Sequence, residues 1–190
     1  MKEKMKEFLS KIHVVESAIL EEYVSYWTEY SVPKNTIMTF ERDTERYMYF
    51  VLEGMQKSYY LNENKEHIIA FTYSPSFSGI PESFLNQSPS NYFLTTITHS
   101  KFLRISFKRH QDLMSKHRSI ETLFRKATEF LLIDTLNRYY ELMAFDIETR
   151  FKNFTTRSPH LLQMASQKDI ASYLRIDPTN FSKLLGSVKI

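Results

Sequence analysis

The stretch SQKDIASYLRIDPTNFSKLL (166–185) carries the most specific pattern of the chain. Ser166 is typical of the residue that caps the start of a helix, and Asp169, three residues on, is its expected acidic capping-box partner. Asp177 is a second cap, and Pro178 follows it at a first helical position, where a missing N–H is no loss. The stretch therefore predicts two consecutive short helices.

The connection between these two helices is very short. Only Arg175 and Ile176 separate the first helix from the second cap, so the helices must cross sharply. Ala171 is small enough to let them approach, and Ile176 is placed to fill the turn. We expect the buried face to consist of Ile170, Ala171, Leu174, Phe181, Leu184 and Leu185. This is the pattern of a helix-turn-helix.

Burying those residues turns a polar face outward near the start of the second helix. In a helix-turn-helix, this face meets base edges and phosphates in the major groove of DNA. We predict that the DNA contacts come from Ser166, Gln167, Lys168, Thr179, Asn180, Ser182 and Lys183. The alternative is an ordinary helical hairpin with a polar outer face, and the local charge favours DNA. Residues 151–190 contain six Lys or Arg and two acidic residues, a net +4, whereas residues 1–150 contain 19 basic and 20 acidic residues, a net −1.

The remainder of the chain alternates helical and strand patterns. Apolar residues at spacings of three and four predict a helix over 1–30, which Pro33 ends. A loop with one helical turn is expected over 74–90, and a hairpin loop over 62–65. Short strands are expected at 36–40, 47–52, 56–61, 67–73, 92–97 and 101–107. Together they predict an antiparallel β-roll.

A second long helical pattern covers 109–145, without Gly or Pro. Its apolar stripe is broader than a small β-domain needs to cover its own core. We therefore expect the same helix of a second subunit to pack on it, the alternative being a helix buried within one chain. The stripe consists of Ile120, Leu123, Phe124, Ala127, Phe130, Leu131, Leu136, Tyr139, Tyr140 and Met143.

Composition excludes several classes of function. Hydrophobic residues make up 42% of the 190 residues, enough for a substantial core, and the absence of Cys excludes disulfides, thiolate nucleophiles and Cys-ligated metals or clusters. The six histidines form no metal-ligand spacing, and no phosphate loop or nucleophile elbow is present, so we expect neither an enzyme nor a cofactor. We expect no signal peptide and no membrane segment, and therefore a cytoplasmic protein.

The chain resembles the cyclic-AMP receptor/fumarate-nitrate regulator (Crp/Fnr) family of transcription factors, in particular the short members common in Bacteroidetes-type bacteria. The stretch YFVLEG (49–54) resembles the strand-and-turn signature of that family, and 77–84 stands in place of its phosphate-binding cassette. Residues 148–174 resemble the entry to its DNA-binding domain. The resemblance implies a cyclic-nucleotide-binding-like jelly roll, a dimer helix and a C-terminal helix-turn-helix.

The chain departs from that family at the nucleotide pocket. Cyclic-nucleotide binders use a Gly-Glu pair and, about ten residues later, an Arg for the phosphate, but here the Arg position falls on Ser90 or Asn91. No Lys or Arg occurs between Lys65 and Lys101, so we expect the pocket to be degenerate and not to bind cyclic AMP. An apolar effector within the aromatic-rich roll is an alternative to plain core packing. Its expected site comprises Gly79, Glu82, Ser83 and Asn91.

The expected protein is a homodimeric α+β transcriptional regulator in three parts: a β-roll effector-like domain (1–109), a dimerisation helix (110–145) and a helix-turn-helix domain (146–190). Its expected partners are double-stranded DNA, a second copy of itself and an unidentified small-molecule effector, with RNA polymerase as a further candidate. At the turn position where the family usually has Gly, this chain has Arg175, and no winged hairpin follows the second helix before Ile190. The alternative is therefore a dimeric ligand-binding or protein-interaction module whose helix-turn-helix does not bind DNA.

Overall fold

A computed structural model describes residues 1–187 of the chain. Within them the helices are α1 (Lys2–Ile12), α2 (Ser17–Ser25), α3 (Pro81–Asn86), α4 (Phe107–Lys116), α5 (Arg118–Ala144), α6 (Ile147–Arg157), α7 (Leu161–Met164), α8 (Gln167–Leu174) and α9 (Pro178–Ser187). The strands are β1 (Thr28–Val32), β2 (Ile37–Thr39), β3 (Tyr47–Glu53), β4 (Met55–Asn62), β5 (Lys65–Tyr73), β6 (Ser76–Ser78), β7 (Phe93–Thr96) and β8 (Ser100–Ser106). All six expected strands are confirmed, and the short β6 lies in the segment expected to be a loop. The helix expected over 1–30 is wrong at its end, because α2 ends at Ser25 and β1 begins at Thr28, where it pairs with β8.

The strands form two four-stranded antiparallel sheets, in the orders β1-β8-β3-β6 and β2-β7-β4-β5. An apolar layer lies between them, made of alternate strand residues together with Ile80, which precedes α3. Its buried members are Val32, Tyr49, Val51, Ile80, Leu94 and Phe102. The expected β-roll is therefore confirmed, and β5 is one of its edge strands.

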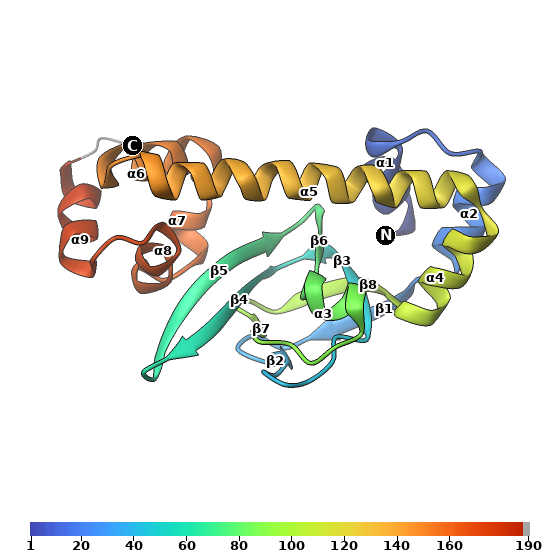
Figure 1. Cartoon of the computed structure of the whole chain (residues 1–190), viewed down its shortest axis with the longest axis horizontal. Coiled ribbons are helices and arrows are strands. Elements are labelled where there is room, and N and C mark those ends of the chain that lie inside the picture. Colours follow the sequence, from blue (N-terminus) through green and yellow to red (C-terminus); the bar gives the residue numbers. More distant parts are fainter. Residues whose placement is uncertain (188–190) are drawn as a thin grey trace.

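Helices cover the outer face of the first sheet. Phe50 and Leu103 of this sheet pack with buried residues of α1, α2, α4 and α5 in one apolar cluster. From this cluster α5 runs past the sheets to the C-terminal helices α6–α9 at the other end of the molecule (Figure 1). The long helix α5 thus connects the roll to the C-terminal helices.

Two expected helices are each divided in two. The first breaks at 13–16, where His13 is extended, and the second breaks at His117, with φ −126° and ψ 106°. Neither break contains Gly or Pro. Each break lets both flanking helices turn an apolar face to the same core, as Leu113 of α4 and Ile120 of α5 do. Tertiary packing overrides local helical preference here.

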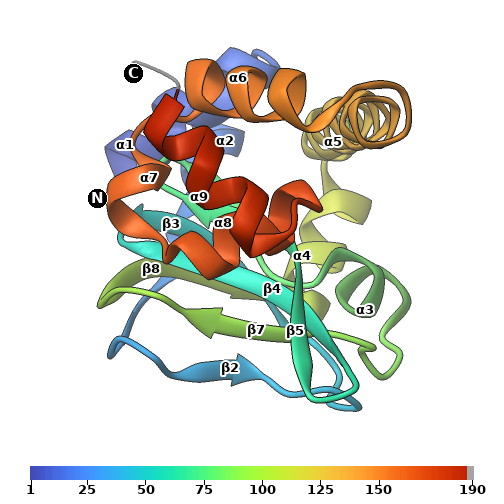
Figure 2. The ribbon, with the colours of Figure 1, turned by 90° about the vertical axis from the view of Figure 1, so that its left-hand side faces the viewer.

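The hairpin between β4 and β5 extends towards the end of the molecule that carries the C-terminal helices (Figure 1), and its strands lie beneath α8 (Figure 2). Its turn residues Glu63 and Asn64 both have positive φ, 51° and 59°, which suits the twist of a two-residue hairpin turn. The expected hairpin loop is confirmed. None of the helices in residues 1–187 is long and apolar enough to cross a membrane.

Candidate nucleic-acid interface

The first helix of the expected motif is α8. Its cap is Ser166, whose Oγ accepts a hydrogen bond from the backbone N–H of Asp169 at 3.0 Å. Ile170, Ala171 and Leu174 are buried, as predicted. The reciprocal half of the expected capping box is replaced by another contact, because the carboxylate of Asp169 lies 3.1 Å from Nζ of Lys57 on β4.

The turn between α8 and α9 contains a left-handed residue. Arg175 has φ 55° and ψ 44°, the conformation that Gly adopts more easily. Ile176 is buried in the turn, and its N–H donates to the carbonyl of Ala171 at 2.9 Å. Asp177 then accepts a hydrogen bond from the N–H of Thr179 at 2.9 Å, so the second predicted cap is also present.

Helix α9 buries one face and exposes the other. Phe181 is 1% exposed and stacks edge-on against Phe151 of α6, with ring centres 5.5 Å apart. Leu184 and Leu185 are partly buried against the same cluster. The exposed face comprises Thr179, Asn180, Ser182 and Lys183. The structure thus brings these four predicted residues together on one surface of the first turns of α9.

The three remaining predicted DNA contacts lie at the start of α8. Ser166, Gln167 and Lys168 are all exposed, and the Ser166 hydroxyl is already engaged in capping the helix. Together they form the N-terminal end of α8, whereas the other four predicted contacts lie on α9. Ser166 also lines a cleft of about 430 Å³ between the roll and α8, together with Asn35, Lys57, Tyr59, Glu66, Thr95 and Asp169.

The basic residues of the C-terminal part have different surroundings. Lys152 pairs with Glu148 at 2.8 Å and Arg157 with Glu141 at 3.1 Å, while Arg175 reaches the β4–β5 hairpin. Two exposed lysines, Lys168 on α8 and Lys183 on α9, have no ion-pair partner among residues 1–187. The sixth basic residue, Lys189, lies outside the described residues. Among the described basic residues of this C-terminal part, the unpaired positive charge therefore lies on α8 and α9.

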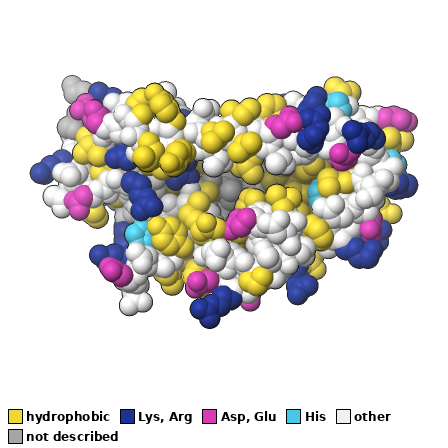
Figure 3. Space-filling view, viewed as in Figure 1, with side chains coloured by type: hydrophobic (Ala, Val, Ile, Leu, Met, Phe, Trp, Pro, Cys, Tyr) yellow, Lys and Arg dark blue, Asp and Glu magenta, His cyan; other side chains and the backbone are white. Residues whose placement is uncertain are grey.

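Apolar side chains also line the exposed surface of α5. The N-terminal third of its predicted stripe is buried against the roll, where Ile120 and Leu123 are fully covered. Beyond it the side chains lie exposed, and hydrophobic groups gather along this helix (Figure 3). The large ones, each at least half exposed, are Phe130, Leu131, Leu132, Ile133, Leu136, Tyr139, Tyr140 and Met143. Contiguous apolar surface of this kind marks an interface.

The residues predicted for an effector occupy the segment around α3. Gly79 has φ 138°, and the hydroxyl of the buried Ser83 accepts from the N–H of Glu45 at 2.9 Å. Burial raises the pKa of Glu82, whose Oε1 atom has no hydrogen-bond partner among the described residues. Asn91 lies exposed beyond this segment. Ser83 is therefore committed to holding the fold, and Glu82 is the polar group left without a partner.

Sequence reasoning missed the residues that attach the helix-turn-helix to the roll. Lys57 on β4, Ser172 on α8 and Arg138 on α5 each bond across this junction. Lys57 and Asp169 are 112 positions apart in the sequence, so no local pattern signals their contact. Among residues 1–187, no group of three or more His, Asp or Glu side chains is placed to hold a metal ion.

Residues 29–117 match the family described as "Cyclic nucleotide-binding domain". No significant match to a curated protein sequence is found. The solved structure of FixK2 from Bradyrhizobium japonicum is similar to the chain with a TM-score of 0.71 and 18% identity, covering 84% of this chain and 83% of that one. The c-di-GMP responsive global regulator CLP from Xanthomonas campestris is similar with a TM-score of 0.64 and 18% identity, covering 90% of both chains.

The catabolite activator protein of Thermus thermophilus is similar with a TM-score of 0.58 and 14% identity, covering 93% of this chain and 84% of that one. At such identities the likeness concerns the fold. It includes the roll, the long helix and the C-terminal helices in one arrangement. Residues 29–117 are therefore similar to a cyclic nucleotide-binding domain, and the chain as a whole shares the fold of FixK2, CLP and the catabolite activator protein.

Proposed function

We propose that this protein is a homodimeric, sequence-specific DNA-binding transcriptional regulator. The observation that carries the proposal is the exposed polar face of α9, formed by Thr179, Asn180, Ser182 and Lys183 above the buried Phe181. Hydroxyl and amide groups can hydrogen-bond to base edges, and a lysine can neutralise a phosphate or contact guanine. Ser166, Gln167 and Lys168 would contact the DNA backbone beside the same groove.

The exposed apolar surface of α5 supports the dimer. A helix of 27 residues spans about 40 Å, and the large apolar side chains of its second half are at least half exposed. Pairing with the same helix of a second copy would bury Leu136, Tyr140 and Met143, each at least 56% exposed in one chain. The two α9 helices would then enter successive major grooves of an inverted repeat.

We propose that this activity is not controlled by cyclic AMP. The segment from Lys65 to Lys101 has no internal Lys or Arg to meet a cyclic phosphate. At α3, burial raises the pKa of Glu82, and burial likewise raises the pKa of the nearby Glu45. Adding an unpaired phosphate to a site that already disfavours negative charge would cost several kcal/mol. An effector, if the roll takes one, would contact Gly79, Glu82, Ser83 and Asn91.

In this proposal residues 1–109 are the effector-type domain, 110–145 the dimerisation region and 146–190 the DNA-binding domain of a cytoplasmic regulator, with RNA polymerase as a further partner. The regulators that resemble it in fold support this assignment, since two of them are described as a global regulator and a catabolite activator protein. A dimeric module that does not bind DNA is the competing function.

The Lys183→Ala variant separates these two functions. The affinity of a DNA-binding dimer for duplex DNA falls steeply as salt rises, because phosphate contacts release counterions. The plot of log K against log salt has a negative slope. Removing one lysine contact from each subunit should make this slope less steep by about one for each contact removed. Binding titrations at several salt concentrations measure this slope, and an unchanged slope would contradict the assignment of Lys183.

A further inference from the structure

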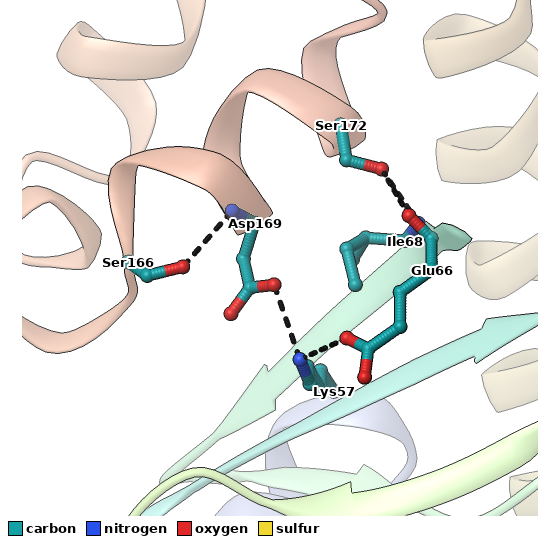
Figure 4. A network of polar contacts seen from close by, with 6 residues as sticks. All are labelled: Lys57, Glu66, Ile68, Ser166, Asp169 and Ser172. Carbon is teal, nitrogen blue, oxygen red and sulfur yellow. Dashed lines mark hydrogen bonds and ion pairs between the residues drawn. The ribbon is translucent and has the colours of Figure 1, made fainter. Parts of the chain in front are cut away.

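Helix α8 covers the open edge of the β-roll. Its Ser172 hydroxyl accepts a hydrogen bond from the N–H of Ile68 at 3.0 Å and donates one to the carbonyl of Glu66 at 3.1 Å (Figure 4). Both partners are backbone groups of β5, the strand at the end of its sheet. Edge groups of this kind are otherwise left to water or to another chain. One side chain therefore joins α8 to the roll through two backbone bonds.

Lys57 forms a second connection between the same elements. Its ammonium lies 2.5 Å from a carboxylate oxygen of Glu66 on β5 and 3.1 Å from one of Asp169 on α8 (Figure 4). The side chains of Lys57 and Asp169 are each 14% exposed. Partly buried ion pairs of this type are screened less than surface pairs, and removing one partner leaves an uncompensated charge.

Arg138 connects α5 to both of these elements. Its guanidinium donates to the carbonyl of Ile69 on β5 and, at 3.3 Å, to the carbonyl of Tyr173 on α8. The guanidinium carbon also lies 3.5 Å from the centre of the Tyr173 ring, within the range of a cation–π contact. A residue of the long helix therefore meets the roll and the helix-turn-helix at one point.

The covalent link between α5 and the C-terminal helices is short and offers a hinge. Helix α5 ends at Ala144 and α6 begins at Ile147, with Phe145 extended between them. Rotation at these few residues would swing all of α6–α9 about the end of α5. The orientation of α9 is consequently set by the contacts that hold the C-terminal helices against the roll. These are an apolar cluster that includes Met55 and Tyr73 of the roll, and the polar contacts made by α8.

We propose that a latch formed by Lys57, Glu66, Arg138, Asp169 and Ser172 determines which half-site spacing the dimer accepts. This inference rests on the proposed function. If two subunits pair through α5, each latch holds its α9 at a fixed distance and angle from the dimer axis. The latch leaves the exposed face of α9 free, because its contacts are made by α8. The latch therefore sets the distance between the two α9 helices of the dimer and leaves their recognition of bases unchanged.

The DNA affinity measured at different half-site spacings reports sensitively on the latch. Each added base pair moves one half-site by about 3.4 Å along the DNA and turns it by about 35°. Two rigidly held recognition helices match one spacing, whereas two helices on loose hinges can follow several. An unfolded variant would bind every spacing more weakly by the same factor. A variant with a loose latch would instead lose its preference for one spacing.

The test begins with the orientation of α9 within one subunit. The chain has no Cys, so labels can be attached specifically at Gly186→Cys and Glu41→Cys. A Cβ at Gly186 meets nothing within 4 Å, and Glu41 is exposed on the roll. Spin labels on one subunit, diluted into unlabelled protein, give the distance between α9 and the roll. The wild-type background should give one narrow distance distribution, and the Asp169→Asn/Ser172→Ala double variant a broad one.

The second half of the test uses the DNA. Duplexes carrying the selected inverted repeat with spacers from two base pairs too short to two too long are titrated with each protein. The wild type should lose affinity at least about tenfold away from its best spacing, and the double variant less than about threefold. The matched control is Glu53→Gln/Ser25→Ala, which removes an exposed ion pair with Lys101 and one exposed Ser hydroxyl bond far from α8, and should behave as wild type.

The outcomes separate the two proposals. If the wild type binds no inverted repeat, the proposed function fails, and the spacing role fails with it. If the wild type binds and the double variant keeps both its narrow distance and its spacing preference, the latch alone is wrong. Arg138→Gln provides an independent check, because it removes contacts of the same latch from the α5 side. Arg138→Gln should broaden the distance distribution between α9 and the roll in the same way. Thermal unfolding verifies that each variant is folded.

Discussion

The guanidinium carbon of Arg138 on α5 lies 3.5 Å from the ring centre of Tyr173 on α8. This contact joins the helix that bears the exposed apolar surface to the first helix of the helix-turn-helix. The same guanidinium bonds two backbone carbonyls, so that the roll, the long helix and α8 meet at one side chain. The position of α8, and of α9 that follows it, is thus coupled to the rest of the chain.

Arg138→Gln should destabilise the protein. The variant leaves the carbonyls of Ile69 and Tyr173 without their donor and removes the cation–π contact, a loss of about 1–3 kcal/mol in the free energy of unfolding. Arg125→Gln is the matched control, because Arg125 lies on the same helix in an exposed pair with Glu129 and should contribute less than about 0.5 kcal/mol. Urea denaturation of both variants measures the difference, and equal losses would contradict the role of Arg138.

Arg175→Gly should stabilise the chain. Arg175 has φ 55°, a left-handed conformation that is unfavourable for a residue with a Cβ, and Gly relieves this strain by about 0.5–1 kcal/mol. The lost contacts are long and exposed, 3.3 Å to the Tyr60 hydroxyl and 3.5 Å to His67. Arg175→Ala loses the same contacts and retains the strain, so its melting temperature should be lower than that of the Gly variant. The reverse order would show that these contacts outweigh the strain.

His110 should make stability depend on pH. Burial lowers its pKa from 6.5 to about 4, beside the Tyr23 hydroxyl at 3.0 Å. The unfolded chain therefore binds more protons between these values, so the contribution of His110 to stability is complete above pH 6.5 and is lost as the pH falls towards 4. The loss amounts to about 3 kcal/mol. Chemical denaturation at several pH values should show a weaker dependence for His110→Gln, and a slope equal to that of the wild type would exclude this origin.

Leu136→Glu should weaken the proposed dimer. It places a charge in the middle of the exposed apolar surface of α5, where pairing would otherwise bury a leucine that is 56% exposed in one chain. We expect the dissociation constant to rise at least about a hundredfold, as measured by sedimentation. Phe40→Glu is the control, since Phe40 is 50% exposed and lies on the roll, directly after β2. If both variants remain dimeric, α5 is not the interface.

Local patterns predicted the helices α8 and α9 and their caps correctly, because the determinants of these features are close in sequence. Ser166 and Asp177 cap their helices from within three residues, and Phe181 is buried through the periodicity of a single helix. The breaks before α2 and at His117 were not predicted, because they follow from packing against a core built from distant segments. The three-residue β6 is too short for a periodic signal.

The contacts that hold the recognition surface in place were beyond sequence reasoning for a related reason. Ser172 bonds to Ile68 and Glu66, which precede it by 104 and 106 positions, and each pairing depends on how α8 lies on the roll. Single residues of ordinary type give no sign of such contacts. The exposed apolar stripe of α5, by contrast, was evident because its width exceeded what one roll needs.

The most direct test of the account is the selection of bound sequences from a pool of random duplexes by the purified protein without added ligand. We predict an inverted repeat whose half-sites are centred about one helical turn, or a multiple of it, apart, and whose enrichment is lost when Lys183 and Asn180 are replaced by Ala. Weak binding with no consensus, unchanged in that double variant, would contradict the central claim that α9 reads DNA.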